Sequence, residues 1–313
     1  MTIKRQTRNN TNTKPGSERN SFRPDVIETY KVEDPVTLLD FLIAAMPMRK
    51  RTNIKELLSH NQIAVNGTPV KQFDTQLTPG DEVKANLTRE FRVFHHRRLQ
   101  IVYEDDDIIV INKGYGLLSM GNDKVKEGTA YSILREYVKW NDPRNKIFIV
   151  HRLDRDTTGL MMFAKTEEAK NIMQHNWNNM VLNRKYLAVV DGKFPEEEGI
   201  YKSYLAENSA HEVYSTDDPE KGQLAVTRYK RLQVHNGYSL MEVELDTGRK
   251  NQIRVHMKEM GYPISGDKRY GGNPSPIHRL ALHAQTLRFV HPITRKEMNF
   301  ATPVPSSFIR LMK

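Results

Sequence analysis

The chain has 313 residues and no cysteine, which excludes disulfides, thiolate catalysis and cysteine-bound zinc. Lysine and arginine outnumber aspartate and glutamate by 48 to 38, and the resulting net charge of +10 favours a polyanionic partner, most commonly nucleic acid. A membrane is the weaker alternative, because no apolar run approaches the roughly 18 residues that cross a bilayer. The length predicts about two domains.

Residues 1–25 form a basic, polar tail with little to bury, and we expect this tail to be disordered. The tail lacks the apolar core of a secretory signal, so the predicted location is the cytoplasm. A merely solvated terminus and a role in RNA binding are equally compatible with this composition.

A small module is predicted over residues 34–87. Apolar residues at helical spacing indicate one helix ending at Pro47 and a second over residues 52–60. Asn66-Gly67 then separates two β-type runs, which is the strongest short-range signal for a hairpin. A turn at residues 79–81 and a further strand follow. The module is basic at Arg49, Lys50, Arg51, Lys55 and Lys71.

The runs "IKELLSHNQIAVNGTPV" and "LTPGDEVK" resemble the S-four-type (alpha-L) RNA-binding domain. The resemblance implies that the helix pair and the hairpin bind structured RNA, and an unrelated small αβ module remains the alternative. The side chains expected to contact RNA are Arg51, Lys55, Asn66 and Lys71.

Residues 88–98 are interpreted as a linker. Arginines and histidines alternate there with phenylalanines, which suits either phosphate contacts with base stacking or a connecting strand. His95 and His96 lack a third ligand in register, so no metal site is predicted.

The second domain is predicted over residues 99–313, with strands at 99–103 and 108–112 and a helix over 129–140. Further strands are predicted at 146–150, 160–164, 184–194, 223–235 and 238–248, with helices at 166–180 and 251–261 and the last strands within 278–292. Many strands without a βαβ rhythm predict an α+β fold with a mixed, largely antiparallel sheet. The four acidic residues 104–107 are interpreted as a turn rather than a metal site.

The stretch "HRLDRDTTGL" places Asp154 between Arg152 and Arg155 at the end of a strand. In extended chain Arg152 and Asp154 point the same way. A nearby cation favours the charged form of a carboxylate, which can then act as a nucleophile. A structural ion pair is the alternative at this stage.

Two further segments carry candidate residues. In "TGRKNQIRVHM" Gly248 precedes a helix whose N-terminus could receive phosphate, and Arg249 and Arg254 could clamp a phosphate or pair with Asp154. Arg254 is expected to share a helix side with Asn251. In "RKYLAVVDG" Tyr186 lies mid-strand, where it is either a core residue or part of a site.

In family order and spacing, these three segments, with "GDKRYGG" and "RLALHAQTLRFVHP", resemble the RluA-type pseudouridine synthases over residues 99–305. The resemblance implies RNA uridine isomerisation without a cofactor or metal. It implies Asp154 as the nucleophile, Arg254 as its salt-bridge partner, and Tyr186 as a stacking residue or general base. Arg152 would fill the space of the flipped nucleotide, because a buried base must leave the stack to react.

Other substrate contacts are expected at Arg155, Arg249 and Asn251. Three positions depart from the family pattern: Thr158 stands for serine, Asn251 for histidine and Gly114 for proline. The Asn251 change could alter a phosphate contact.

The predicted function is an RNA pseudouridine synthase acting as a monomer. Large structured RNA is the expected substrate, with ribosomal RNA favoured and transfer RNA left open. A non-catalytic RNA-binding or ribosome-assembly factor on the same scaffold is the alternative. A glycoside hydrolase would require a second acid opposite Asp154, and Asp156 is too close in sequence to provide it. Whether Asp154 attacks a ring carbon or the anomeric carbon stays open.

Overall fold

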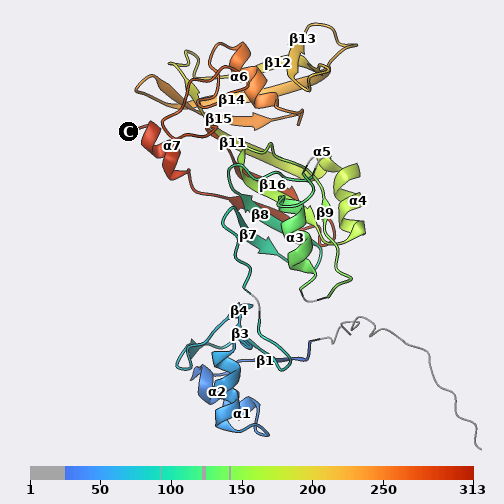
Figure 1. Cartoon of the computed structure of the whole chain (residues 1–313), viewed down its shortest axis with the longest axis vertical. Helices are drawn as coiled ribbons and strands as arrows, with labels where there is room; N and C mark the ends of the chain where they lie inside the picture. The colour runs from blue at the N-terminus through green and yellow to red at the C-terminus, as the bar shows by residue number, and fades with distance from the viewer. Residues whose placement is uncertain (1–24, 92, 122–124, 141) are drawn as a thin grey trace, which may run out of the picture. The chain divides into compact units, whose positions relative to one another are not determined.

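The computed structural model describes residues 25–91, 93–121, 125–140 and 142–313, so nearly all of the predicted tail lies outside the described residues. The chain divides into two compact units, residues 1–93 and 94–313 (Figure 1). Each unit has a hydrophobic core of its own.

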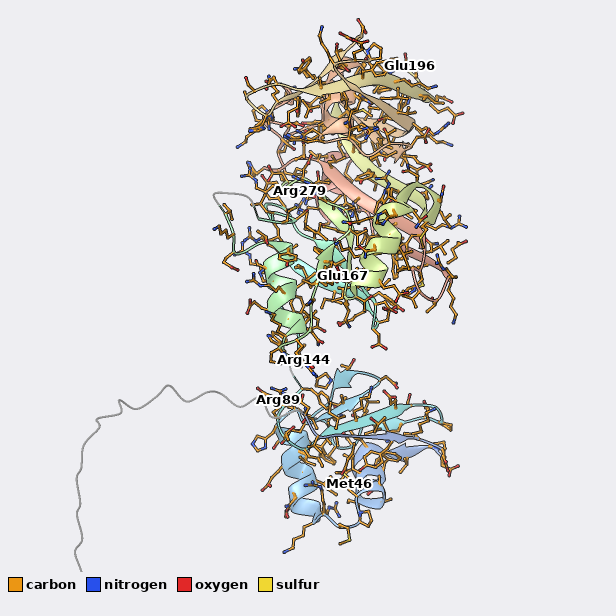
Figure 2. All side chains as sticks on the ribbon, turned by 90° about the vertical axis from the view of Figure 1, so that its right-hand side faces the viewer. Met46, Arg89, Arg144, Glu167, Glu196 and Arg279 are labelled. Carbon is orange, nitrogen blue, oxygen red and sulfur yellow. The ribbon has the colours of Figure 1, made fainter. Side chains whose placement is uncertain are left out.

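The first unit packs two helices, α1 (Leu38–Ala45) and α2 (Arg51–Ser59), against small sheets. One sheet has the order β1-β6-β3-β4, with β1 (Ile27–Lys31), β6 (Glu82–Asn86), β3 (Ile63–Val65) and β4 (Thr68–Pro69). The other pairs β2 (Val36–Thr37) with β5 (Gln76–Leu77). Thr37 caps α1 by accepting a hydrogen bond from the Asp40 N–H, and buried Met46 follows the helix (Figure 2).

The hairpin is present as predicted, since Asn66 and Gly67 both adopt the positive φ of a type I′ turn. The predicted start of this module at residue 34 is too late. Strand β1 pairs antiparallel with β6 from Ile27 to Lys31, so the sheet begins seven residues earlier. The sequence of β1 hides this because one of its faces is exposed.

The second unit is built on an eleven-stranded sheet with the order β13-β12-β14-β15-β11-β16-β10-β8-β7, with β17 beside β16 and β9 beside β10. The strands are β7 (Leu99–Glu104), β8 (Ile108–Lys113), β9 (Phe148–Ile149), β10 (Thr158–Ala164), β11 (Val181–Asp191), β12 (Glu198–Glu207), β13 (Val213–Thr216), β14 (Gln223–His235), β15 (Tyr238–Leu245), β16 (Leu282–Val290) and β17 (Glu297–Ala301). The helices are α3 (Ala130–Val138), α4 (Glu167–His175), α5 (Trp177–Met180), α6 (Gln252–Glu259) and α7 (Ser306–Leu311).

Every strand pair in this sheet is antiparallel except β10 with β16. The predicted α+β fold with a mixed, largely antiparallel sheet is therefore confirmed. At the parallel pairing, Gly159 has φ +112° and a Cβ there would collide with the Ala284 carbonyl. Glycine is required at this point, immediately after the loop that carries Asp154.

Several elements differ from the prediction. Strands β12, β13 and β17 and helix α7 were not predicted, and the helix expected over 166–180 divides at Asn176 into α4 and α5. The predicted linker is also shorter than 88–98, because Phe94 packs on Tyr137 of the second unit and the Arg98 carbonyl accepts the Gly114 N–H at 2.7 Å. The acidic turn is present: Asp105 accepts the N–H groups of Asp107 and Ile108.

Candidate active site

Asp154 lies in the loop between β9 and β10, and its neighbour Leu153 fixes that loop. The Ser119 hydroxyl donates to the Leu153 carbonyl at 2.6 Å and accepts the Leu153 N–H at 3.1 Å. Leu153 is buried, whereas the Asp154 side chain keeps 25% of its surface exposed. The alternation of an extended chain therefore anchors one side of the loop in the core and presents Asp154 on the other side.

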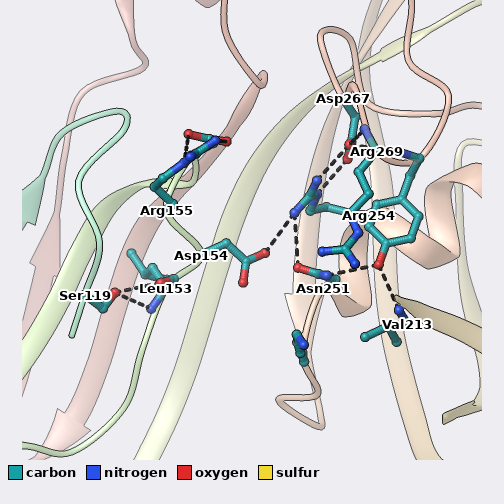
Figure 3. A network of polar contacts seen from close by, with 12 residues as sticks. Ser119, Leu153, Asp154, Arg155, Val213, Asn251, Arg254, Asp267 and Arg269 are labelled. Carbon is teal, nitrogen blue, oxygen red and sulfur yellow. Dashed lines mark hydrogen bonds and ion pairs between the residues drawn. The ribbon is translucent and has the colours of Figure 1, made fainter. Parts of the chain in front are cut away.

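Arg254 of α6 is the cation beside Asp154, as predicted, with 3.5 Å between Nη1 and the Asp154 carboxylate (Figure 3). Its stronger partner is Asp267, which accepts from Nε at 2.7 Å and from Nη2 at 2.8 Å. The Tyr270 ring lies beneath the guanidinium at 4.9 Å. Burial alone would lower the pKa of Arg254, but the hydrogen bonds and charge of Asp267 and the charge of Asp154 raise it above its ordinary value.

Two adjoining pockets meet at Asp154. The larger, of about 710 Å³, is lined mainly by polar and basic side chains, whereas the smaller, of about 60 Å³, contains Tyr186 and aliphatic residues. Four residues line both pockets: Arg152, Asp154, Asn251 and Arg254. The carboxylate thus stands where a large basic space meets a small pocket of mixed polar and aliphatic lining.

Tyr186 of β11 forms one wall of the small pocket and is only 8% exposed. Burial raises the pKa of Tyr186, against the opposing effect of the Arg184 cation. The phenol is therefore protonated at neutral pH.

The other predicted residues of this site fall into different positions. Arg152 is exposed and lines both pockets. Arg155 is turned away from Asp154 and pairs with Asp156 at 3.1 Å (Figure 3). Arg249 lines the small pocket while its Nε donates to the Leu224 carbonyl at 3.0 Å.

Asn251, a predicted substrate contact, lines both pockets, and its amide already has partners within the site. Its amide oxygen accepts from Arg254 at 3.1 Å, and its amide nitrogen donates to the Tyr270 hydroxyl at 3.0 Å. Its φ of 55° is left-handed, a conformation that asparagine and histidine tolerate better than most residues. This explains why asparagine can replace the histidine of the family pattern. Gly248 precedes this helix as predicted, and α6 begins at Gln252, one residue after the predicted start.

In the first unit, Arg51, Lys55 and Lys71 are exposed, so each can reach a ligand. Asn66 differs. Its amide nitrogen donates to Asp81 and its amide oxygen accepts the Glu82 N–H, both at 2.9 Å, so the side chain stabilises the hairpin itself.

Two important residues were missed from the sequence. Asp267 has a fully buried carboxylate, although its segment "GDKRYGG" had been noted. Lys113 is also fully buried, and its Nζ donates to the carbonyls of Leu117, Arg155 and Gly114. Burial lowers the pKa of Lys113 to about 7, against the opposing charge of Asp154. Lys113 thus ties the Asp154 loop to the end of β8.

One group among the described residues has the composition of a metal site: the ligand atoms of Asp105, Asp107 and His291 lie within 4.8 Å of one another. However, His291 Nδ1 accepts the N–H groups of Ile293 and Thr294. Its proton is therefore on Nε2, which donates to Asp105 at 3.0 Å. The group is an internal hydrogen-bonded cluster rather than an open set of ligands.

None of the helices in the described ranges is long and apolar enough to span a membrane.

The comparisons with known proteins agree with this fold and site. Residues 107–259 match the RNA pseudouridylate synthase family model. Over 265 residues the chain is 33% identical to the "Uncharacterized RNA pseudouridine synthase YhcT" of Bacillus subtilis (strain 168), covering 83% of this chain and 87% of that protein. Over 293 residues it is 32% identical to "Ribosomal large subunit pseudouridine synthase D" of Escherichia coli (strain K12), covering 88% and 89%.

The fold is shared with the solved structure of Human RNA Pseudouridylate Synthase Domain Containing 4. That structure aligns with a TM-score of 0.56 and 24% identity, over 67% of this chain and 90% of that chain. The family match and the two relatives define the class of the protein as an isomerase. The chain belongs to the RNA pseudouridine synthases, and to the RluA type among them.

Proposed function

We propose that this chain converts specific uridines of ribosomal RNA to pseudouridine, with Asp154 as the nucleophile. The observation that carries the proposal is the place of Asp154 between the two pockets, 3.5 Å from a guanidinium that Asp267 already holds. Because Asp267 neutralises most of the Arg254 charge, Asp154 is only loosely bound and is free to attack.

The two pockets divide the substrate by chemistry. Tyr186, Leu245 and Ile253 in the wall of the small pocket suit one face of a flat uracil ring, which would enter there and extend into the large pocket. The larger basic pocket suits the phosphates of the strand. In the reaction Asp154 forms a bond to the substrate and is released again, the nitrogen–carbon bond between uracil and ribose breaks, the ring turns, and a carbon–carbon bond to ribose forms. The ring carbon that becomes attached loses its proton to solvent, and the detached ring nitrogen takes one up, so the product is an isomer of the substrate. A protonated Tyr186 supports stacking on the base rather than the uptake of the proton from the ring carbon.

The first unit would hold the structured RNA through Arg51, Lys55 and Lys71, as in the S-four-type domain that it resembles. Ribosomal RNA is favoured because a relative of nearly equal length is named for the large ribosomal subunit. We propose that the protein acts as a monomer in the cytoplasm.

The test compares pseudouridine maps of ribosomal and transfer RNA from a strain lacking this gene and from strains complemented with wild type or Asp154→Asn. We expect loss of one or a few ribosomal sites, restored by the wild type alone. Retained RNA binding by Asp154→Asn would separate catalysis from binding. Restoration of the sites by Asp154→Asn would refute the nucleophile, and an unchanged map would favour the non-catalytic assembly factor.

A further inference from the structure

Arg279 lines the large pocket from the segment just before β16, and its place in the second unit is labelled in Figure 2. Two aromatic rings confine its guanidinium: Phe308 at 5.1 Å and Tyr115 at 6.0 Å. These contacts hold a cation in one position at the pocket wall.

The hydrogen bonds of this guanidinium are incomplete. Within the described ranges its one hydrogen bond runs from Nη2 to the Thr158 hydroxyl at 3.2 Å. The Nε atom is buried without an acceptor there. No carboxylate of the described residues forms an ion pair with Arg279, whereas Arg254 in the same pocket has two.

Arg279 is partly buried. A partly buried charge without a partner is unfavourable for folding, and proteins retain such a group when a ligand uses it. Burial lowers the pKa of Arg279 below its ordinary value, which reflects the same lack of compensation. The wall of the large pocket at Arg279 therefore lacks one anion that would balance this charge.

The surrounding charges identify the kind of anion. Cationic side chains outnumber acidic ones around the large pocket, where the acids are Asp154, Asp156 and Asp267 and the cations are Arg152, Arg155, Lys250, Arg254, Lys268, Arg269 and Arg279. Asp267 and Asp156 already pair with arginines. The RNA substrate of a pseudouridine synthase brings one abundant anion to this pocket, the backbone phosphate.

We propose that Arg279 binds a phosphodiester of the RNA strand adjacent to the target uridine. Nη1, which has no acceptor among the described residues, and the second N–H of Nη2 form the fork that matches two phosphate oxygens. Arg279 thereby fixes the strand in the large pocket while the base enters the small one.

The test uses full-length protein and a synthetic RNA containing the uridine mapped above. Arg279→Met removes the charge but keeps an unbranched side chain. Arg288→Met is the matched control, because Arg288 of β16 is exposed and paired with Glu297 of β17. We expect Arg279→Met to weaken RNA binding about tenfold or more, and the slope of log Kd against log salt to fall by about one. Arg288→Met should change neither.

Methylphosphonates introduced singly around the uridine then locate the contact. One of them should weaken binding to the wild type but not to Arg279→Met. The thermal midpoint should stay the same or rise in Arg279→Met, because a partly buried unpaired charge is removed.

A structural role predicts the reverse: a lower thermal midpoint and equal methylphosphonate effects in both proteins. That result would overturn the phosphate site. Binding is the readout, so the outcome is independent of whether Asp154 is the nucleophile. If mapping yields no target uridine, the wild type and Arg279→Met are compared on large-subunit ribosomal RNA. The affinity, the salt slope and the thermal midpoint then decide between the phosphate contact and a structural role.

Discussion

The substitution Asp267→Asn tests how much the buried Arg254–Asp267 ion pair stabilises the second unit. The substitution keeps the side-chain shape, and the remaining amide oxygen can still accept the N–H groups of Arg269 and Tyr270 at 3.1 Å. It removes the charge that accepts two short hydrogen bonds from Arg254. Breaking a buried ion pair on one side costs about 3–5 kcal/mol. For a unit of this size that corresponds to a fall in Tm of roughly 10 °C.

Asp246→Asn is the matched control, since Asp246 also receives two hydrogen bonds from an arginine, Arg228, but both partners are exposed. We expect no measurable change in its Tm, because water and salt screen an exposed pair. Differential scanning calorimetry of both variants at one pH and salt measures the contrast. Equal changes in Tm would show that burial does not determine the strength of the Arg254–Asp267 pair.

Three further outcomes are expected. Asn251→His should fold and remain active. Asn251→Leu should lower the free energy of unfolding by about 1 kcal/mol, seen as a lower Tm, because leucine disfavours positive φ. Gly114→Pro should lower the free energy of unfolding by about 1–3 kcal/mol. A Cβ at this position would lie 2.9 Å from the Arg98 carbonyl oxygen, and proline lacks the N–H that donates to that oxygen. Burial lowers the pKa of His283 to about 4, so only the unfolded chain binds a proton between pH 6.5 and 4. The Tm should therefore decrease as the pH is lowered from 6.5 to 4. This decrease should be less steep in His283→Asn. An unchanged Tm in Asn251→Leu, in Gly114→Pro or across the pH range would contradict the stated cause, as would a loss of activity in Asn251→His.

The sequence predicted the meeting of Asp154 and Arg254 because both belong to segments with a recognisable order along the chain. It did not predict Asp267 as the main partner of Arg254. That pair forms only when the segment after Gly266 folds back on α6, and nothing local in "GDKRYGG" indicates which side chain turns inward. The resemblance located the region without assigning its contacts.

The missed strand β12 shows a second limit. Its inward face carries polar groups that find partners on α6, as Ser203 does with His256 at 3.1 Å. Its outward face is partly apolar, with Ile200 48% exposed. The usual alternation of apolar inside and polar outside is therefore blurred, and only the folded sheet reveals the strand.

The pairing of β10 with β16 also determines when the site can exist during synthesis. Thr158 lies opposite His283, 125 positions later in the chain, and β16 stands between the two halves of the sheet. A nascent chain that ends before β16 can therefore form neither the central pairing nor the anchored Asp154 loop. Contacts of such sequence separation form slowly, so activity appears only after the last strands have been released from the ribosome. We therefore expect a product that ends before β16 to be inactive, even though it contains Asp154, Tyr186 and Arg254.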